Sequence, residues 1–438
     1  MVKSTKNICR VLFFSGVLLV TSACSDSFLQ TDSPNQPSQT TYWQTESDAL
    51  MALTACYDAM QSQNLYDDNI DGWKFGFLGR ETSTDNGDHT WGDWMLGSSI
   101  SKCASSTTDE CFSMYWNANY EVIKRCNMLV ENVERIPMEA EKIDAYKAEA
   151  IALRALMYCN LTSVFRDVPY LTKPLTLAEA QAPKAERSQI ISSLLEDLKT
   201  WIPKIPVIGK AQKGRMSQEA GYAIMGRIAL FNQRWDEAIT AYKNVVGKVQ
   251  LFKSGDGTDY AANYADLFKE ANEDNCEIIL AAKKVENDYK NQTIIEFCNA
   301  NDGGWSAFVP IQSLVDAYET SSGLTIEEAE KNGEYDPVHP YKNRDPRFYA
   351  TVLYSGADWV NPNGVYRIYN TLDRTIDGKP NKDNANDSRN ASQSGYTCCK
   401  YMSPLTQYSD INNTGLDFIV FRYAEVLLSK AEALIELN

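Results

Sequence analysis

The feature that most constrains this 438-residue chain is a stretch that predicts two antiparallel helices in close contact. It reads GYAIMGRIALFNQRWDEAITAYKNVV over residues 221–246. Tyr222 and Gly226 belong to the first predicted helix, and Ala238 and Tyr242 belong to the second. Small residues let two helix backbones approach closely, and aromatic rings fill the groove between them. Such a hairpin needs neighbouring hairpins to bury its remaining apolar faces.

The same four positions fit the aromatic and small positions of a tetratricopeptide repeat, although any tight helical hairpin favours small residues at its crossing. Further helices are predicted where apolar residues recur at spacings of three and four. A first helix is predicted at 46–63, and apolar stripes follow at 122–133, 143–164 and 190–201. For the last of these, Ser188 is the predicted N-cap and Pro203 the stop. The predicted fold class is therefore mainly α, built on tetratricopeptide-like hairpins.

The second half of the chain shows a different pattern. Residues 250–415 are rich in turn residues, with short strand-like runs such as 276–281. Residues 371–395 are almost wholly polar and predict a mobile surface loop. Residues 64–112 have no sustained period and predict a long functional loop region. The chain ends in an apolar-striped helix, FRYAEVLLSKAEALIELN, which should feed a turn and a partner helix, so we expect a C-terminal truncation.

The N-terminus has the layout of a secretory signal. Three basic residues precede an apolar run at 11–20, which is shorter than the ~20 residues that span a bilayer. Small residues then precede Cys24, and the site resembles the lipobox of bacterial lipoproteins, although Thr21 stands where Leu is usual. An ordinary cleaved signal with an incidental cysteine is the alternative. We predict a lipoprotein signal peptide at 1–23, a tether lipidated at Cys24 over 24–45, and a single domain over 46–438.

Composition excludes several classes of partner and site. The formal net charge of −16 argues against nucleic acid and anionic membrane as binding partners, because both bind basic patches. The chain has only His89 and His339 and no C-x-x-C spacing, so a zinc site is not expected. Asp67-x-Asn69-x-Asp71 begins like a calcium loop, but Leu78 stands where the closing Glu is required. An Asx-rich turn is preferred over a calcium site, and no cofactor is expected.

The nine cysteines that follow the predicted lipidation site are not assigned to disulfides. Cys56, Cys126 and Cys159 lie among apolar helix positions and are predicted to be small buried residues. In an exporting compartment, Cys103 with Cys111, or the adjacent pair at 398 and 399, can oxidise. The spacing does not decide the pairing.

Several segments together resemble the SusD/RagB family of Bacteroidetes surface lipoproteins. The segments are CSDSFLQTDSP, YWNANYEVIKRCNMLVENVERIP, AEAIALRALMYCNLTSVFRDVPYL, GRMSQEAGYAIMGRIALF, YADLFKEANEDNCEIILAAKK, SLVDAYETSSGLTIEEA, YDPVHPYKNRDPRFYATVLYSG and FRYAEVLLSKAEAL. The resemblance implies a SusD-like helical scaffold that supports a loop-rich, ligand-binding half. It also implies an outer-membrane, surface-exposed, lipid-anchored protein that is not an enzyme. Such proteins capture a nutrient, usually a glycan, and cover a SusC-like TonB-dependent transporter.

A non-catalytic sugar site needs flat aromatic rings for the sugar faces and polar side chains for the hydroxyls. The stretch TSTDNGDHTWGDWML supplies both, and in the family the corresponding loop contributes to glycan contacts. The candidate ligand-binding residues are Trp91, Trp94, Asp85, Asn86, Trp305 and Trp359, with Tyr366 and Tyr369 as weaker candidates. The alternative for each tryptophan is a core contact that anchors its loop. Trp116, Trp201 and Trp235 fall in predicted helices and are assigned to the core.

Three other functions stay open on the sequence. Peptide is an alternative cargo for the same import machinery. A secreted glycoside hydrolase is a second alternative, since the 58 acidic residues leave room for a catalytic carboxyl pair. A pure protein-interaction scaffold is the third. The chain contains no G-x-S-x-G, P-loop, G-x-G-x-x-G or H-E-x-x-H motif, so no catalytic residue is predicted.

Overall fold

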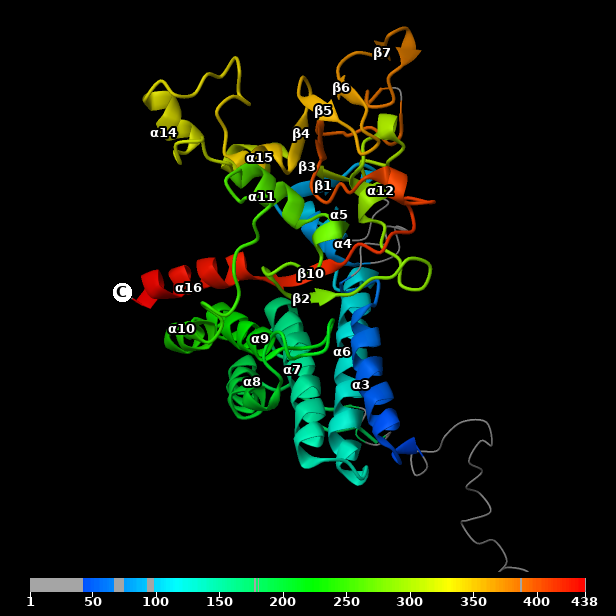
Figure 1. Cartoon of the computed structure of the whole chain (residues 1–438), viewed down its shortest axis with the longest axis vertical. Coiled ribbons are helices and arrows are strands. Elements are labelled where there is room, and N and C mark those ends of the chain that lie inside the picture. Colours follow the sequence, from blue (N-terminus) through cyan, green and yellow to red (C-terminus); the bar gives the residue numbers. More distant parts are fainter. Residues whose placement is uncertain are drawn as a thin grey trace, which may run out of the picture.

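The computed structural model describes residues 42–66, 75–92, 98–176, 179, 181–386 and 388–437. A helical scaffold forms the lower half of Figure 1, and a loop-rich half with short helices and strands lies above it. The scaffold consists of α3 (Glu46–Met60), α6 (Glu110–Asn132), α7 (Ala140–Phe165), α8 (Arg187–Trp201), α9 (Gln218–Phe231), α10 (Trp235–Lys243) and α16 (Tyr423–Leu437). The predicted mainly α architecture with a loop-rich half is confirmed.

Short elements make up the rest of the described chain. The helices are α4 (Phe77–Glu81), α5 (Ser98–Ser101), α11 (Tyr260–Leu267), α12 (Thr293–Phe297), α13 (Gln312–Ala317), α14 (Ile326–Lys331) and α15 (Pro346–Tyr349). The strands are β1 (Gly87–His89), β2 (Ile278–Ala282), β3 (Phe308–Pro310), β4 (Val352–Tyr354), β5 (Asp358–Val360), β6 (Tyr366–Ile368), β7 (Thr375–Ile376), β8 (Lys379–Pro380), β9 (Tyr396–Cys398) and β10 (Phe418–Arg422). They form antiparallel pairs β1–β3, β2–β10, β4–β9, β5–β6 and β7–β8.

The predicted hairpin at 221–246 is confirmed as α9 and α10. A Cβ atom built on Gly226 would lie 2.5 and 2.7 Å from two ring atoms of Tyr242, and closer still to a third. No side chain fits there, so glycine is what allows the Tyr242 ring to lie against the α9 backbone. Tyr242 and Ala238 are both buried at this crossing. The small and aromatic positions therefore do the packing that the sequence pattern indicates.

The helix ends follow local chemistry, which corrects one predicted cap. At α3, Thr45 and Asp48 form a reciprocal capping box, so this helix begins where predicted, and it ends at Met60 rather than at residue 63. The predicted N-cap Ser188 is wrong, because α8 begins at Arg187 and Ser188 lies inside its first turn. The carboxylate of Asp167 accepts the backbone N–H of Arg187 at 2.8 Å. A side chain distant in sequence thus satisfies a helix-terminal donor that a local cap was expected to serve.

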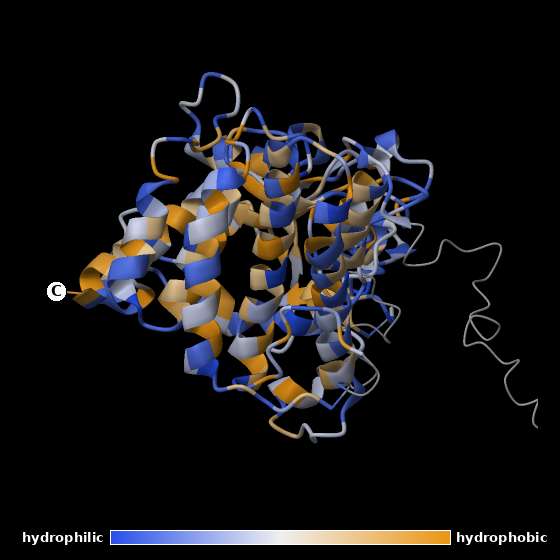
Figure 2. Cartoon of the chain, turned by 90° about the horizontal axis from the view of Figure 1, so that it is seen from below, coloured by the Kyte–Doolittle hydropathy of each residue, from blue (hydrophilic) through white to orange (hydrophobic). Residues whose placement is uncertain are grey.

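One main hydrophobic core fills the scaffold. It extends through α3, α6, α7, α8, α9 and α10 and reaches β2, β10 and α16. Figure 2 shows that these helices carry both hydrophobic and hydrophilic residues, as expected when one face is buried. Cys56, Cys126 and Cys159 lie in this core as predicted, and Trp116, Trp201 and Trp235 pack against it. The nine cysteines among the described residues are unpaired thiols.

The guanidinium of Arg227 fixes strand β10 and helix α16 against α9. Arg227 of α9 donates two hydrogen bonds to Glu425, at 2.7 and 2.6 Å, and one to the carbonyl of Val420 at 3.0 Å. Its charged group also lies 3.4 Å from the ring centroid of Phe421. These contacts fix β10 and α16 against α9, and β10 in turn pairs with β2. In the described ranges, every helix is too short or too polar to cross a bilayer.

The polar segment 371–395 is not the mobile loop that its composition predicts. Its side chains Asn381, Asp383 and Asn384 are each at most 3% exposed. The Asn381 amide donates to the carbonyls of residues 370 and 373, and the Asn384 amide to those of 371 and 372. Side-chain amides thus satisfy backbone groups that no sheet or helix would satisfy. The ordered segment contributes Asn386, Ser388, Arg389 and Gln393 to one wall of a hollow in the loop-rich half.

Candidate functional site

A hollow of about 570 Å³ lies beside Trp91 in the loop-rich half. Thr90 and Trp91 contribute one wall just after β1, and the segment between residues 385 and 393 contributes the other. The lining side chains from that segment are Asn386, Ser388, Arg389 and Gln393, with Ala385 beside them. The hollow therefore combines an indole with amide, hydroxyl and guanidinium groups.

Strand β1 fixes where Trp91 lies. Gly87, Asp88 and His89 pair with Pro310, Val309 and Phe308 of β3. A Cβ atom at Gly87 would lie 2.5 Å from a ring atom of Phe308, so a larger residue there would force the Phe308 ring to move. Just beyond the strand, Thr90 donates its backbone N–H to the carbonyl of Ala307 at 3.0 Å.

The side chains around Trp91 hold its ring in place. Its backbone N–H donates to Nδ1 of His89 at 3.2 Å, and the two rings lie 5.4 Å apart. His89 is 4% exposed, and burial lowers the pKa of its imidazole to about 4. The imidazole is therefore neutral at physiological pH, which keeps Nδ1 available as an acceptor.

Two predicted tryptophans come together at this place. The rings of Trp91 and Trp305 lie 5.7 Å apart with an interplanar angle of 49°, and both side chains are half-buried. They pack on a small apolar cluster of Leu78, Phe297, Ala307, Phe308 and Cys398. The guanidinium carbon of Arg389 lies over the Trp91 ring, 5.7 Å from its centroid. The Trp91 indole thus contacts an apolar cluster and a cationic side chain.

A buried polar network holds the segment that carries Asn386, Ser388 and Arg389. Asp383 accepts hydrogen bonds from the backbone and amide of Asn301, at 3.0 and 2.7 Å. Arg367 donates to Asp383 at 3.1 Å, to Asp302 at 3.2 Å and to Asn299 at 2.5 Å. The network joins β6 to the loop around residue 300 and to the segment 385–393, which forms the wall of the hollow opposite Trp91. Several hydrogen bonds between segments distant in sequence favour one loop geometry, although the Nε of Arg367 is buried without a partner among the described residues.

Trp359 belongs to that network and does not line the hollow. Its indole N–H donates to Asp302 at 2.7 Å, and the amide of Asn361 donates to the same carboxylate at 2.8 Å. These donors and Arg367 keep the pKa of Asp302 below its usual value despite the burial that opposes them. Trp359 thus helps position the wall, and a direct ligand contact for it stays a prediction.

The structure places the other predicted site residues as follows. Asp85 is exposed, and its backbone carbonyl accepts from Ser313 at 2.5 Å. The Asn86 amide donates to Glu81 at 2.8 Å, so both residues brace the approach to β1 and neither lines the hollow. Tyr366 is exposed on β6, whereas Tyr369 is fully buried, so the suggestion that Tyr369 meets a ligand is wrong. Trp94, Cys24 and the calcium-like segment 67–72 lie outside the described residues.

Sequence reasoning missed the wall formed by Asn386, Ser388, Arg389 and Gln393. Their polar, turn-rich context predicted mobility rather than a site. The available signal was the spacing of Asn381, Asp383 and Asn384, because short amide and carboxylate side chains at such intervals commonly tie down a loop backbone. Among the described residues, no cluster of three or more His, Cys, Asp or Glu side chains could hold a metal ion.

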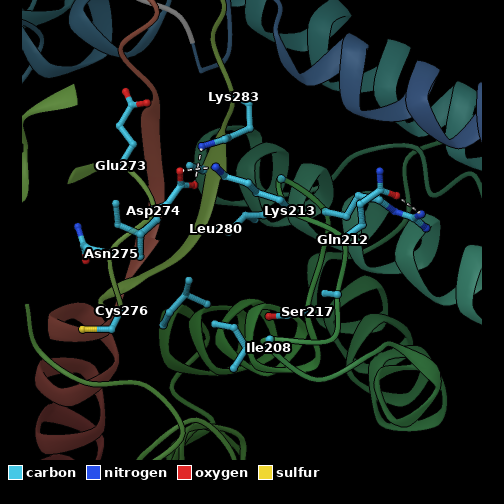
Figure 3. A pocket seen from close by; sticks show the side chains of 17 residues that line it. Ile208, Gln212, Lys213, Ser217, Glu273, Asp274, Asn275, Cys276, Leu280 and Lys283 are labelled. Atoms are coloured by element: carbon cyan, nitrogen blue, oxygen red, sulfur yellow. Dashed lines mark hydrogen bonds and ion pairs between the residues drawn. The ribbon is translucent and has the colours of Figure 1, made fainter. Parts of the chain in front are cut away.

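A second hollow, of about 390 Å³, lies between the loop at 208–217 and β2. Figure 3 shows Lys213 and Lys283 directed at Asp274 across it, and the two ammonium groups lie 2.5 and 3.4 Å from that carboxylate. Lys283 also forms an ion pair with Asp417. Burial and the Asp417 charge raise the pKa of the nearby Glu273 carboxyl to about 8. This lining contains no aromatic side chain, so it offers a sugar ring nothing to stack on.

Comparisons with known families agree over most of the chain. Residues 276–438 match the family described as "SusD family", and residues 27–230 match the family described as "Starch-binding associating with outer membrane". The SusD-like protein P25 of Formosa agariphila is 26% identical over 299 residues, which cover 64% of this chain and 53% of that protein. The SusD-like protein P38 of the same organism is 24% identical and matches all of this chain and 80% of its own length. The chain thus spans about half the length of the first of these relatives.

Solved structures share the fold. A SusD-like carbohydrate-binding protein from Bacteroides fragilis superposes with a TM-score of 0.77 and 26% identity, covering 91% of this chain and 75% of that one. A laminarin-binding SusD-like protein superposes with a TM-score of 0.67 and 24% identity, covering 90% and 81%. The arrangement of helical hairpins under a loop-rich half is thus common to these proteins. The family matches and the shared fold show that this chain belongs to the SusD/RagB family.

Proposed function

We propose that this protein binds carbohydrate without cleaving it, in the hollow beside Trp91. The observation that carries the proposal is the half-buried Trp91 indole, which lines the hollow opposite amide, hydroxyl and guanidinium groups and is packed on Trp305, a residue outside the lining. Indole faces pack on the C–H faces of a sugar ring, and the wall side chains reach its hydroxyls. Two structural relatives, one described as carbohydrate-binding and one as laminarin-binding, support this ligand class.

The lining of the hollow favours binding over hydrolysis. Glycoside hydrolysis by the usual route requires a pair of carboxyl groups flanking the scissile bond. None of the described lining residues of this hollow is Asp or Glu. Asp302 and Asp383, two carboxylates of the supporting network, accept hydrogen bonds from Arg367, Asn301 and Asn361. We therefore propose that the glycan leaves this site chemically unchanged.

We propose further that the protein acts at the cell surface, anchored to the outer membrane through lipid on Cys24. It would capture oligosaccharide there and deliver it to a SusC-like TonB-dependent transporter. Membership of the SusD/RagB family supports this role, as does the family description that places starch binding at the outer membrane. The lipobox-like sequence before Cys24 supports the anchor. Peptide cargo would instead require contacts along an extended backbone.

Affinity electrophoresis against a panel of polysaccharides tests the ligand class. The protein should be retarded by at least one glycan, and the recovered glycan should be uncut. Trp91→Ala should reduce the retardation, whereas Tyr260→Ala, which removes an 80% exposed aromatic that does not line the hollow, should leave it unchanged. Retardation lost equally in both variants, or a cleaved glycan, would contradict the proposal.

A further inference from the structure

A hollow of about 640 Å³ lies in the helical scaffold, where the end of α7, the start of α8 and the end of α9 meet. It shares no lining residue with the hollow beside Trp91. Three arginines line it: Arg166 at the C-cap of α7, Arg187 at the start of α8, and Arg234 at the N-cap of α10. The hydroxyls of Ser188 and Ser192 lie in the same lining. The hollow is therefore dominated by hydrogen-bond donors.

Two of the three guanidinium groups have no carboxylate partner among the described residues. Arg166 is exposed, and its side chain makes no hydrogen bond or ion pair within the described chain. Arg187 donates from Nη2 to the carbonyl of Phe231 at 3.1 Å, while its Nε is buried and unpartnered there. Arg234 differs, because it forms an ion pair with Glu237 at 2.6 Å. The guanidinium N–H groups of Arg166 and Arg187 are thus available as hydrogen-bond donors in the lining.

The two carboxylates in the lining leave most of these donors unused. Asp167 accepts the backbone N–H of Arg187, so one of its oxygens is directed at the helix backbone. Glu186 is exposed at the helix cap and makes no capping bond through its side chain. Because Glu237 pairs with Arg234, the guanidinium groups of the lining that no described carboxylate pairs are those of Arg166 and Arg187. Unpaired guanidinium groups of this kind attract oxyanions from solution.

The chemistry of the donors identifies the class of ligand. A guanidinium presents a fork of N–H groups that matches an oxyanion through two parallel hydrogen bonds. Arg187 and Ser188 open the 15-residue α8, whose N-terminal end adds a partial positive charge to the arginines. The lining holds no aromatic side chain, so a neutral sugar ring would find no stacking surface. Charge, rather than an apolar face, must therefore select the occupant.

We propose that this hollow binds a phosphate- or sulfate-type oxyanion, either free or carried as an ester on a small molecule. Arg166 and Arg187 supply the charged donors, and the two serine hydroxyls complete the coordination of the oxyanion oxygens. The proposal is independent of the glycan site, because the two hollows share no residue.

Isothermal titration calorimetry of the whole protein tests the proposal, with inorganic phosphate, glucose 6-phosphate and glucose titrated at constant ionic strength. Both phosphates should bind, and Arg166→Gln should weaken them about tenfold, as expected for the loss of a charge-assisted hydrogen bond. Because the Arg166 side chain has no described contact, this variant should fold normally. Arg135→Gln removes another exposed arginine whose side chain contacts none of the described residues through a hydrogen bond or ion pair; it is the matched control and should bind like wild type.

Comparing the titrations with inorganic phosphate and glucose 6-phosphate also distinguishes a free anion from a phosphate ester. Equal affinities for the two phosphates would support a free anion, whereas tighter binding of glucose 6-phosphate would support an ester. Absence of binding by both phosphates at millimolar concentration would overturn the proposal. So would binding that Arg166→Gln and Arg135→Gln reduce alike, because a general charge effect would then explain it.

Discussion

Replacing Gly226 by alanine tests the packing that forms the scaffold hairpin. The added Cβ would lie 2.5 and 2.7 Å from ring atoms of Tyr242, where ordinary contact requires more than about 3.4 Å. The Tyr242 ring is 1% exposed, so it has no free space into which to move. Overpacking of this kind costs about 1–3 kcal/mol. Alanine in place of glycine inside a helix also stabilises by about 1 kcal/mol, which offsets part of that cost.

Gly221→Ala in the same helix is the matched control. Its Cβ would lie 3.0 Å from Cγ1 of Ile202 and 3.4–3.5 Å from two other atoms of that flexible side chain. The gain in helix propensity is the same for both variants, while the steric cost is small only at residue 221. We expect Gly226→Ala to be less stable than Gly221→Ala by about 1–3 kcal/mol.

Urea unfolding followed by far-ultraviolet circular dichroism measures both variants against wild type. A lower midpoint for Gly226→Ala with an unchanged slope would support the reasoning. Equal midpoints for the two variants would refute it, because the Tyr242 ring would then accept a Cβ at no cost.

Three further predictions concern the loop-rich half and its charges. Arg367→Met should destabilise by about 3–5 kcal/mol in urea unfolding and weaken glycan binding in calorimetry, because it removes the cation that pairs with the buried carboxylates of Asp302 and Asp383. Arg374→Met, at an exposed arginine, should change neither stability nor binding. The pKa of Glu273 is about 8 in the folded state and about 4.5 in the unfolded chain, so the free energy of unfolding should fall as pH rises from about 4.5 to 8. Glu273→Gln should reduce that fall in urea unfolding measured across this pH range. The lowered pKa of His89, about 4, has the opposite sign, so stability should fall as pH drops from about 6.5 to 4, and tryptophan fluorescence should report the opening near Trp91.

The scaffold could be predicted from sequence because its signals are local. Apolar residues at helical spacing identify α6, α7 and α8, and Gly226 with Tyr242 identifies the crossing of α9 and α10. The start of α8 was misplaced because its capping acceptor, Asp167, lies 20 residues away. Local periodicity carries no information on such a partner.

The candidate site was only partly predictable. Aromatic residues in turn-rich sequence pointed to Trp91 and Trp305, whose rings do meet. The opposite wall was missed because its order comes from side-chain hydrogen bonds between segments about 80 residues apart, such as Asn301 with Asp383. A polar composition predicts mobility when those partners are unknown. The same long-range contacts show that Trp359 braces the wall rather than lines it.

The central claim is that the Trp91 indole is a stacking surface for sugar, and one measurement tests it most directly. Calorimetry with the glycan that binds best should give dissociation constants for wild type, Trp91→Phe and Trp91→Ala. An aromatic stacking contact contributes about 1 kcal/mol or more, so Trp91→Ala should bind at least about fivefold more weakly. Trp91→Phe, which keeps a smaller ring, should lie between the two. Equal dissociation constants for all three folded proteins would contradict the claim and place the sugar elsewhere.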